Sequence, residues 1–152
     1  MDDFEKSLNH LFVSTFNLIL KYEEKSMEKA LNIPITITEA HMIDVIGKQD
    51  GKKNSISSIA SLLNIAVPTA TVAIKKLESK GVIKKIPCEN DARRMIISLT
   101  EAGKKIEKAH HVFHTKMVRA VSRQFADAEK EIILKVTAVL MEFFKKEAEV
   151  LV

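Results

Sequence analysis

The sequence predicts a mainly α-helical protein that carries one small β-hairpin. Glycine and proline are scarce, with 4 and 3 among 152 residues, which favours long ordered helices. Over most of the chain, apolar residues recur at spacings of three and four, as they do on one face of an α-helix. Two short segments, 82–86 and 95–99, instead have the composition of strands, and the polar residues between them predict a hairpin with a charged tip.

Two helices are expected before the middle of the chain. The first is a long amphipathic helix that begins near Phe4 and ends near Leu31. The second begins at a Thr38 cap and stops at Gly47. A polar turn over 49–54 follows and separates these helices from the next pair.

A pair of short helices joined by a tight turn comes next. Ser57 is expected to cap the third helix, and the fourth begins after Asn64 with Pro68 in its first turn. Gly81 ends the fourth helix and leads into the hairpin.

The last third of the chain predicts two long helices. Thr100 is expected to cap a fifth helix that runs to about Phe125, and a sixth extends from about Asp127 to the end. Their wide apolar faces, like that of the first helix, have little core of their own to bury against. We therefore expect a homodimer in which these helices pack on a second copy of the chain.

Length and composition exclude several classes of protein. The chain fits one domain that can bury a core without disulfides, metal or any other required cofactor. Its single cysteine, Cys88, cannot form an intrachain disulfide, and the acidic start at Asp2 and Asp3 is unlike a signal peptide. No apolar run approaches membrane-spanning length. We therefore expect a cytoplasmic protein without a membrane partner.

Basic residues concentrate in the middle of the chain. The net charge is +4, but residues 51–94 hold nine Lys or Arg against three Asp or Glu, which gives +6 for this segment. Such a distribution is typical of a segment that binds a polyanion. A basic face that is merely solvated is the alternative.

The third and fourth helices have the arrangement of a helix-turn-helix, which inserts its second helix into the major groove of double-stranded DNA. Opposite its apolar stripe, the fourth helix exposes hydroxyl, methyl and ammonium groups that suit base edges, thymine methyls and phosphates. In the hairpin, which would form the wing, Arg93 and Arg94 can enter a minor groove while Asp91 fixes the loop. The predicted contacts on the fourth helix are Val67, Pro68, Thr69, Thr71, Val72, Lys75 and Lys76.

An enzyme is not expected. The sequence has no glycine-rich phosphate loop, nucleophile elbow, paired catalytic carboxylates or metalloprotease motif. A helical protein-interaction module is the rival class, and it would account for the apolar terminal helices but not for the wing or the basic middle. Salt dependence separates the two, because only binding through phosphate contacts weakens steeply with salt.

Four stretches of the chain form a pattern: IASLL at 59–63, VAIKKLESKG at 72–81, NDARR at 90–94 and SLTEAG at 98–103. Together they resemble the MarR family of transcriptional regulators. The resemblance covers nearly the whole chain and implies a dimeric winged helix-turn-helix that binds palindromic operators, usually as a repressor. It implies that Asp91 and Arg93 form the wing pair and that Thr69 and Thr71 contact DNA. Ala66 departs from the pattern, because relatives commonly have a polar cap there.

The resemblance also divides the chain by role. It implies dimerisation helices at 1–34 and 103–152, which flank a winged helix-turn-helix lobe at 35–102. Within the family, segments 39–48 and 110–114 resemble the fatty-acid-synthesis repressor branch, the FabT-like proteins. This branch implies a long acyl chain as effector, delivered by acyl carrier protein, in a tunnel lined by apolar residues near the helix junctions.

A second constellation indicates a metal instead. His110 and His114 lie one turn apart on the fifth helix, a spacing that lets two imidazoles bind one ion. Glu24 and His41 lie on segments expected to pack nearby, and the four residues match the ligands of the zinc-responsive branch of the same family. Zinc is therefore the alternative effector, and histidines that pack without any metal are the third possibility.

Overall fold

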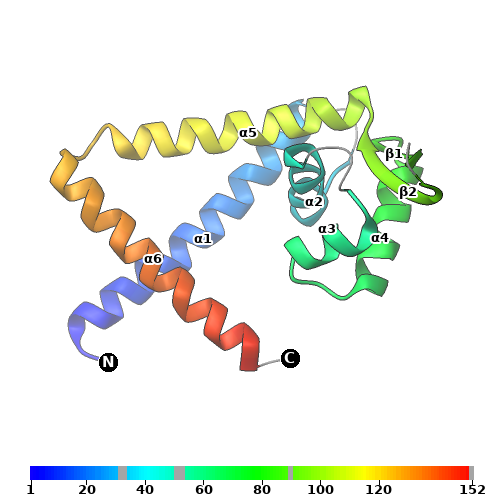
Figure 1. The fold of residues 1–152 in the computed structure, drawn as a ribbon. Helices are drawn as coiled ribbons and strands as arrows, with labels where there is room; N and C mark the ends of the chain where they lie inside the picture. Colours follow the sequence, from blue (N-terminus) through cyan, green and yellow to red (C-terminus); the bar gives the residue numbers. More distant parts are fainter. Residues whose placement is uncertain (31–33, 50–53, 89–90, 151–152) are drawn as a thin grey trace. The chain divides into compact units, whose positions relative to one another are not determined.

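The structure, a computed structural model, describes residues 1–30, 34–49, 54–88 and 91–150. In this part of the chain it has six helices and one two-stranded antiparallel sheet, which confirms the predicted fold class (Figure 1). The elements are α1 (Asp3–Ala30), α2 (Ile37–Lys48), α3 (Ile56–Leu62), α4 (Val67–Ser79), β1 (Ile83–Cys88), β2 (Asp91–Leu99), α5 (Glu101–Ser122) and α6 (Asp127–Val150).

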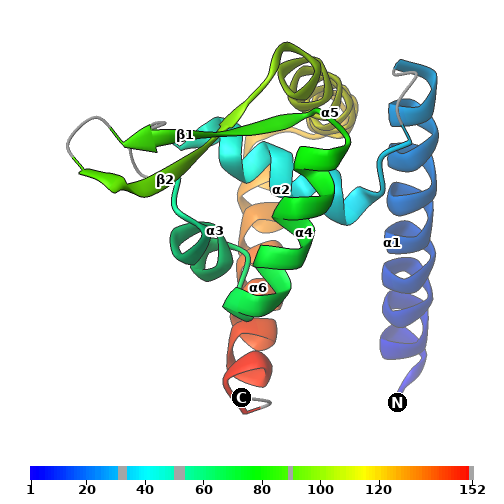
Figure 2. The same ribbon diagram turned by 90° about the vertical axis from the view of Figure 1, so that its right-hand side faces the viewer.

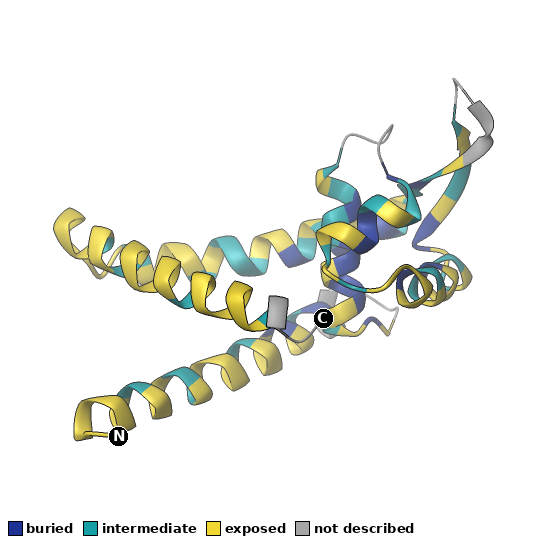
Figure 3. Ribbon diagram, turned by 60° about the horizontal axis from the view of Figure 1, so that its bottom comes forward, coloured by how far each residue is buried: buried dark blue, intermediate teal, exposed yellow. Residues whose placement is uncertain are grey.

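The chain divides into two compact units, Met1–Phe113 and His114–Val152. The buried core lies in the first unit, where buried residues gather on the short helices and the sheet while the long helices are mostly exposed (Figure 3). The predicted division into dimerisation helices and a DNA-binding lobe is a division by role, and it stays a prediction. The largest fully buried apolar side chains are Met42, Ile43, Ile46, Ile59, Ile74, Leu77, Ile97, Ile106 and Val82.

The helix-turn-helix forms as predicted, with α3 and α4 packed against each other beside the hairpin (Figure 2). Asn64 has a left-handed backbone with φ of 51°, which asparagine adopts more readily than most residues. The next residue, Ile65, donates its backbone N–H to Ala60 O at 3.0 Å and closes the end of α3. Local backbone chemistry therefore sets the turn that orients α4.

Two predicted helix caps are wrong by two residues each. Thr36, not Thr38, caps α2, because only Thr36 has a glutamate three residues later. Its Oγ1 accepts from the Glu39 backbone N–H at 3.3 Å, and its own N–H donates to Glu39 Oε2 at 2.9 Å. Ser55, not Ser57, caps α3 by accepting from the backbone N–H three residues on.

The two strands form a longer hairpin than the sequence predicts. Their pairing runs from Ile83 opposite Leu99 to Cys88 opposite Asp91, with an irregularity after Pro87. Pro87, Cys88 and Asp91 of the predicted polar tip therefore take part in the ladder, because backbone pairing at an exposed hairpin end does not require apolar side chains.

The junction of the wing with α5 is fixed by close packing. Thr100 Oγ1 donates to Gly81 O at 2.7 Å and accepts from the Gly103 backbone N–H at 3.2 Å, which confirms Thr100 as the cap. A Cβ at Gly103 would overlap the backbone oxygen of Val82. Only glycine therefore lets the first turn of α5 approach the start of the wing so closely.

The long helices keep much apolar surface exposed. Several large side chains on α1, including Phe4 and Leu11, and on α6, including Leu134 and Val139, are at least 60% exposed. Among the described residues, no single helix has both the length and the hydropathy to cross a membrane. Only α3 and α4 meet those criteria, as a pair bent by 110°.

Candidate DNA interface and metal site

Helix α4 has one face in the core and the opposite face in solvent. Ala70, Ile74 and Leu77 are buried. Val72, on the other side, is 69% exposed, which leaves its methyls available to a partner. Of the predicted contacts on this helix, Thr71 is partly exposed and Val67, Pro68, Thr69, Val72, Lys75 and Lys76 are exposed.

The first turn of α4 is capped by no side chain. Ala66 occupies the cap position without a side-chain hydrogen bond, as its departure from the family pattern implied. The hydroxyl of Thr71 donates to Val67 O at 2.8 Å, so this group is already used within the helix. The Thr71 oxygen can still accept, but its hydrogen is taken, so Thr69 is the better placed of the two threonines to donate a hydrogen bond to a base or a phosphate.

The wing is present, but the predicted contacts at its tip are only partly described. Asp91, Arg93 and Arg94 lie in β2, and their side chains lie outside the described residues. Their roles in DNA binding stay predictions.

The two lysines near the end of α4 face a buried carboxylate that the sequence analysis missed. Lys80 Nζ donates to both oxygens of Glu39, at 2.8 and 2.7 Å, and Lys76 Nζ lies 3.2 Å from Glu39 Oε1. Burial raises the pKa of Glu39, but the hydrogen bonds from Lys80, the Thr36 backbone and Lys76 outweigh it and lower the pKa below the ordinary 4.5. Glu39 is therefore ionised at neutral pH.

The lowered pKa of Glu39 makes the stability of the fold depend on pH in a defined direction. Since the pKa of Glu39 is lower in the folded than in the unfolded chain, the charged form stabilises the fold at pH values above about 4.5. That contribution is lost as the pH falls through the lowered pKa of the folded state.

A buried carboxylate also lies between two histidines. Glu23 of α1 is 1% exposed, and its Oε1 lies 2.8 Å from His110 Nε2 of α5 and 3.4 Å from His41 Nε2 of α2. The ligand atoms of these three residues lie within 4.8 Å of one another. Three helices thus bring one carboxylate and two imidazoles to one point, in the combination that binds zinc.

Of the two remaining predicted ligands, His114 is placed as predicted on α5, whereas Glu24 is not placed as predicted. His114 follows one turn after His110 on the continuous helix α5, so the helix carries both imidazoles on one face. Glu24, however, is exposed, and the adjacent Glu23 takes the predicted position. Neighbouring residues on a helix point about 100° apart, so only one of the two glutamates can face inward.

Asp44 is a further acidic group that the sequence analysis missed. Its Oδ1 lies 3.6 Å from His110 Nδ1, and its Oδ2 accepts from Lys48 Nζ at 2.6 Å. A carboxylate facing the second nitrogen of a metal-binding imidazole fixes the orientation of the ring. The spacing of Asp44 three residues after His41 on α2 was the sequence signal for it.

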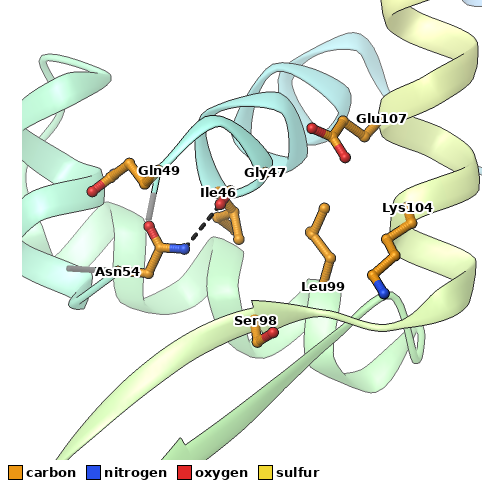
Figure 4. Close-up of a pocket in the computed structure, with 8 residues that line it drawn as sticks. All are labelled: Ile46, Gly47, Gln49, Asn54, Ser98, Leu99, Lys104 and Glu107. Carbon is orange, nitrogen blue, oxygen red and sulfur yellow. Dashed lines mark hydrogen bonds between the residues drawn. The ribbon is translucent and has the colours of Figure 1, made fainter. Parts of the chain in front are cut away.

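A cavity of about 290 Å³ lies between the end of α2, β2 and the start of α5 (Figure 4). Asn54 is buried there and links α2 to β2: its Nδ2 donates to Ile46 O at 2.9 Å, and its backbone oxygen accepts from Ile97 N–H at 2.8 Å. The lining mixes polar and apolar side chains, and the apolar tunnel that the family resemblance implies for an acyl chain stays a prediction. Five of its eight residues are polar or charged: Gln49, Asn54, Ser98, Lys104 and Glu107.

Together these features define a DNA-binding protein of the winged helix-turn-helix class. Residues 35–95 match the MarR family. The transcriptional regulator ZitR of Lactococcus lactis subsp. cremoris is 28% identical over 135 residues, which cover 84% of this chain and 91% of ZitR. A solved structure of a single-residue variant of Lactococcus lactis ZitR is 30% identical, covers 75% of this chain and 78% of ZitR, and has a TM-score of 0.55.

A second similar structure includes DNA. Streptococcus pneumoniae FabT in complex with DNA is 29% identical, with a TM-score of 0.80, and the alignment covers 93% of this chain and 98% of FabT. The chain belongs to the MarR family and is a DNA-binding transcriptional regulator.

Proposed function

We propose that the chain is a metal-responsive repressor that binds double-stranded DNA as a homodimer in the cytoplasm, with zinc as its effector. The buried cluster of Glu23, His41 and His110 is the observation that carries this proposal. The structure of ZitR described as a zinc-responsive MarR family member supports it, at 27% identity over 90% of this chain. Helix α4 and the wing would contact DNA, and His114 would be the fourth ligand.

The donor set fits a zinc ion. With metal–ligand bonds of about 2.0 to 2.2 Å, two ligands of a tetrahedral site lie about 3.3 to 3.5 Å apart. The 3.4 Å between His41 Nε2 and Glu23 Oε1 has this length, and the 2.8 Å between His110 Nε2 and the same oxygen requires only a small opening. A bound ion would supply a positive charge that ties α1, α2 and α5 together.

This link suggests how metal and DNA binding would be coupled. His41 lies on α2, which packs on α3, and His110 lies on α5, which continues directly from the wing. A state in which α1, α2 and α5 are held together has fewer orientations of the DNA-binding elements available to it. Metal and DNA would then each change the affinity of the protein for the other by the same factor.

Operator affinity is expected to depend on zinc in the parent and not in His114→Ala. Loss of one imidazole leaves three protein ligands and weakens zinc binding. Operator affinity is measured with zinc and with a chelator, at fixed pH and salt, for both proteins. His10→Ala, which removes an exposed histidine of α1, is the control and should respond as the parent does. An operator affinity of the parent that is equal under both conditions would contradict the zinc proposal.

An acyl-chain effector is the second candidate, because the chain is similar to FabT over nearly its whole length. Under this proposal the histidines are polar partners, and a zinc effect would be absent from parent and variant alike. No contact among the described residues supports acyl carrier protein as a partner, and that part stays an expectation from the family resemblance.

The homodimer is expected at micromolar concentration. Exposed apolar residues on α1 and α6, such as Phe16 and Phe144, would be buried by a second copy. A dimer also presents two recognition helices, which can read half-sites about one helical turn of DNA apart. Light scattering checks the mass, and a monomer of 17.1 kDa would refute this prediction.

A further inference from the structure

A buried acidic group of α2 lies close to the C-terminal end of α4. Glu39, near the start of α2, is only 6% exposed and is faced by Lys76 in the second half of α4 and by Lys80 at the C-cap of that helix. The sequence analysis predicted Lys76 as a DNA contact, but here its ammonium is directed to a carboxylate of its own protein.

Lys76 and Lys80 contact Glu39 in different ways. Lys80 is anchored, because its Nζ donates to both oxygens of Glu39 and also to Pro34 O at 2.7 Å, and its side chain is only 21% exposed. Lys76 reaches Glu39 Oε1 from the solvent side, with its side chain 57% exposed. Lys80 therefore fixes the end of α4, whereas Lys76 is the lysine that Glu39 and a phosphate would compete for.

We propose that Glu39 is a positioning residue for DNA binding, which holds Lys76 on the protein and withholds its ammonium from the DNA backbone. The Glu39 carboxylate is only 6% exposed, so salt screens its attraction for the Lys76 ammonium less than it screens a fully exposed ion pair. The neighbouring Lys75 then makes the phosphate contact on this part of α4. This inference rests on the proposed contact of α4 with DNA.

As a consequence, a smaller share of the DNA affinity would come from contacts that are independent of the DNA sequence. Each lysine that neutralises a phosphate strengthens binding to any DNA, and only contacts with base edges distinguish the operator. By removing one such lysine per subunit, Glu39 would raise the ratio of operator binding to non-specific binding.

The test is the slope of log affinity against log salt, which changes by about 0.9 per phosphate contact and so by about 1.8 for a dimer. Lys75→Gln is expected to make the slope shallower by about 1.8, whereas Lys76→Gln leaves it unchanged. Glu39→Gln keeps an acceptor for the Thr36 N–H but removes the charge, so it should release Lys76 and steepen the slope by about 1.8. Adding Lys76→Gln to Glu39→Gln should restore the parent slope, which a merely structural role of Glu39 would not do.

Three outcomes overturn the inference. A shallower slope for Lys76→Gln alone, equal to that of Lys75→Gln, would mean that Lys76 does contact phosphate, while the proposed DNA contact of α4 would stand. An unchanged slope for Glu39→Gln, in a protein with parental circular dichroism, would also refute it. If neither Lys75→Gln nor Lys76→Gln changes the slope, the proposed phosphate contact of α4 fails together with the inference, whereas base contacts of α4 are not tested by the slope. If Glu39→Gln does not fold, the salt slopes of Lys75→Gln and Lys76→Gln still decide which of the two lysines contacts phosphate.

Discussion

Glu23→Gln is expected to weaken zinc binding by about 100-fold or more, whereas Glu24→Gln leaves it unchanged. The carboxylate of Glu23 lies between His41 and His110 and would supply the only negative charge among the proposed ligands. A neutral amide of the same shape keeps the packing but is a much poorer ligand for zinc. Glu24 is exposed on the neighbouring face of α1, so its loss removes no ligand.

The zinc affinity of both variants is measured by titration with zinc in competition with a chelator of known affinity. Because the two substitutions are chemically identical and adjacent, differences in net charge cancel between them. Thermal unfolding without metal shows whether Glu23→Gln retains the fold after losing its contact with His110. Equal zinc affinity for Glu23→Gln and the parent would exclude the cluster as a metal site, and loss of zinc binding in Glu24→Gln would restore the ligand set inferred from the sequence.

The sequence analysis predicted Glu24 as a ligand, whereas Glu23 lies beside the histidines. This one-residue difference shows which features of a site can be predicted from a sequence. The spacing of His110 and His114 follows from the helix repeat, so the sequence alone places both on one face of α5. The choice between Glu23 and Glu24 depends on the exact rotation of a 28-residue helix. One signal was present: Glu23 is four residues before Met27, which is 2% exposed, so it lies on the buried stripe.

The fold was more predictable than the site. The order of helices and hairpin follows from hydrophobic periodicity and from local signals such as Thr100 and Gly103, which act within a few residues. The Glu39–Lys80 ion pair joins residues 41 positions apart, and no local pattern indicates it. The caps of α2 and α3 were misplaced because several hydroxyl residues stand near each helix start, and only the position of Glu39 decides the first of them.

Ile74→Ala is expected to lower the free energy of unfolding by about 2 to 5 kcal/mol, whereas Val72→Ala should change it by no more than about 0.5 kcal/mol. Ile74 is fully buried in the core on the inner face of α4, and its truncation leaves a cavity. Val72 is two residues away on the same helix and 69% exposed, so its truncation removes little buried surface, and alanine favours the helix.

DNA binding is expected to respond in the opposite way. Val72→Ala should weaken operator binding by about 1 kcal/mol per half-site if its methyls contact a thymine, with an unchanged salt slope because no charge is lost. Ile74→Ala should bind the operator nearly as the parent does wherever it is fully folded, because its side chain points away from the DNA face. Denaturant unfolding and operator titration on the same samples check both effects. If Val72→Ala instead lost stability without losing affinity, the proposed contact of Val72 with the major groove would be refuted.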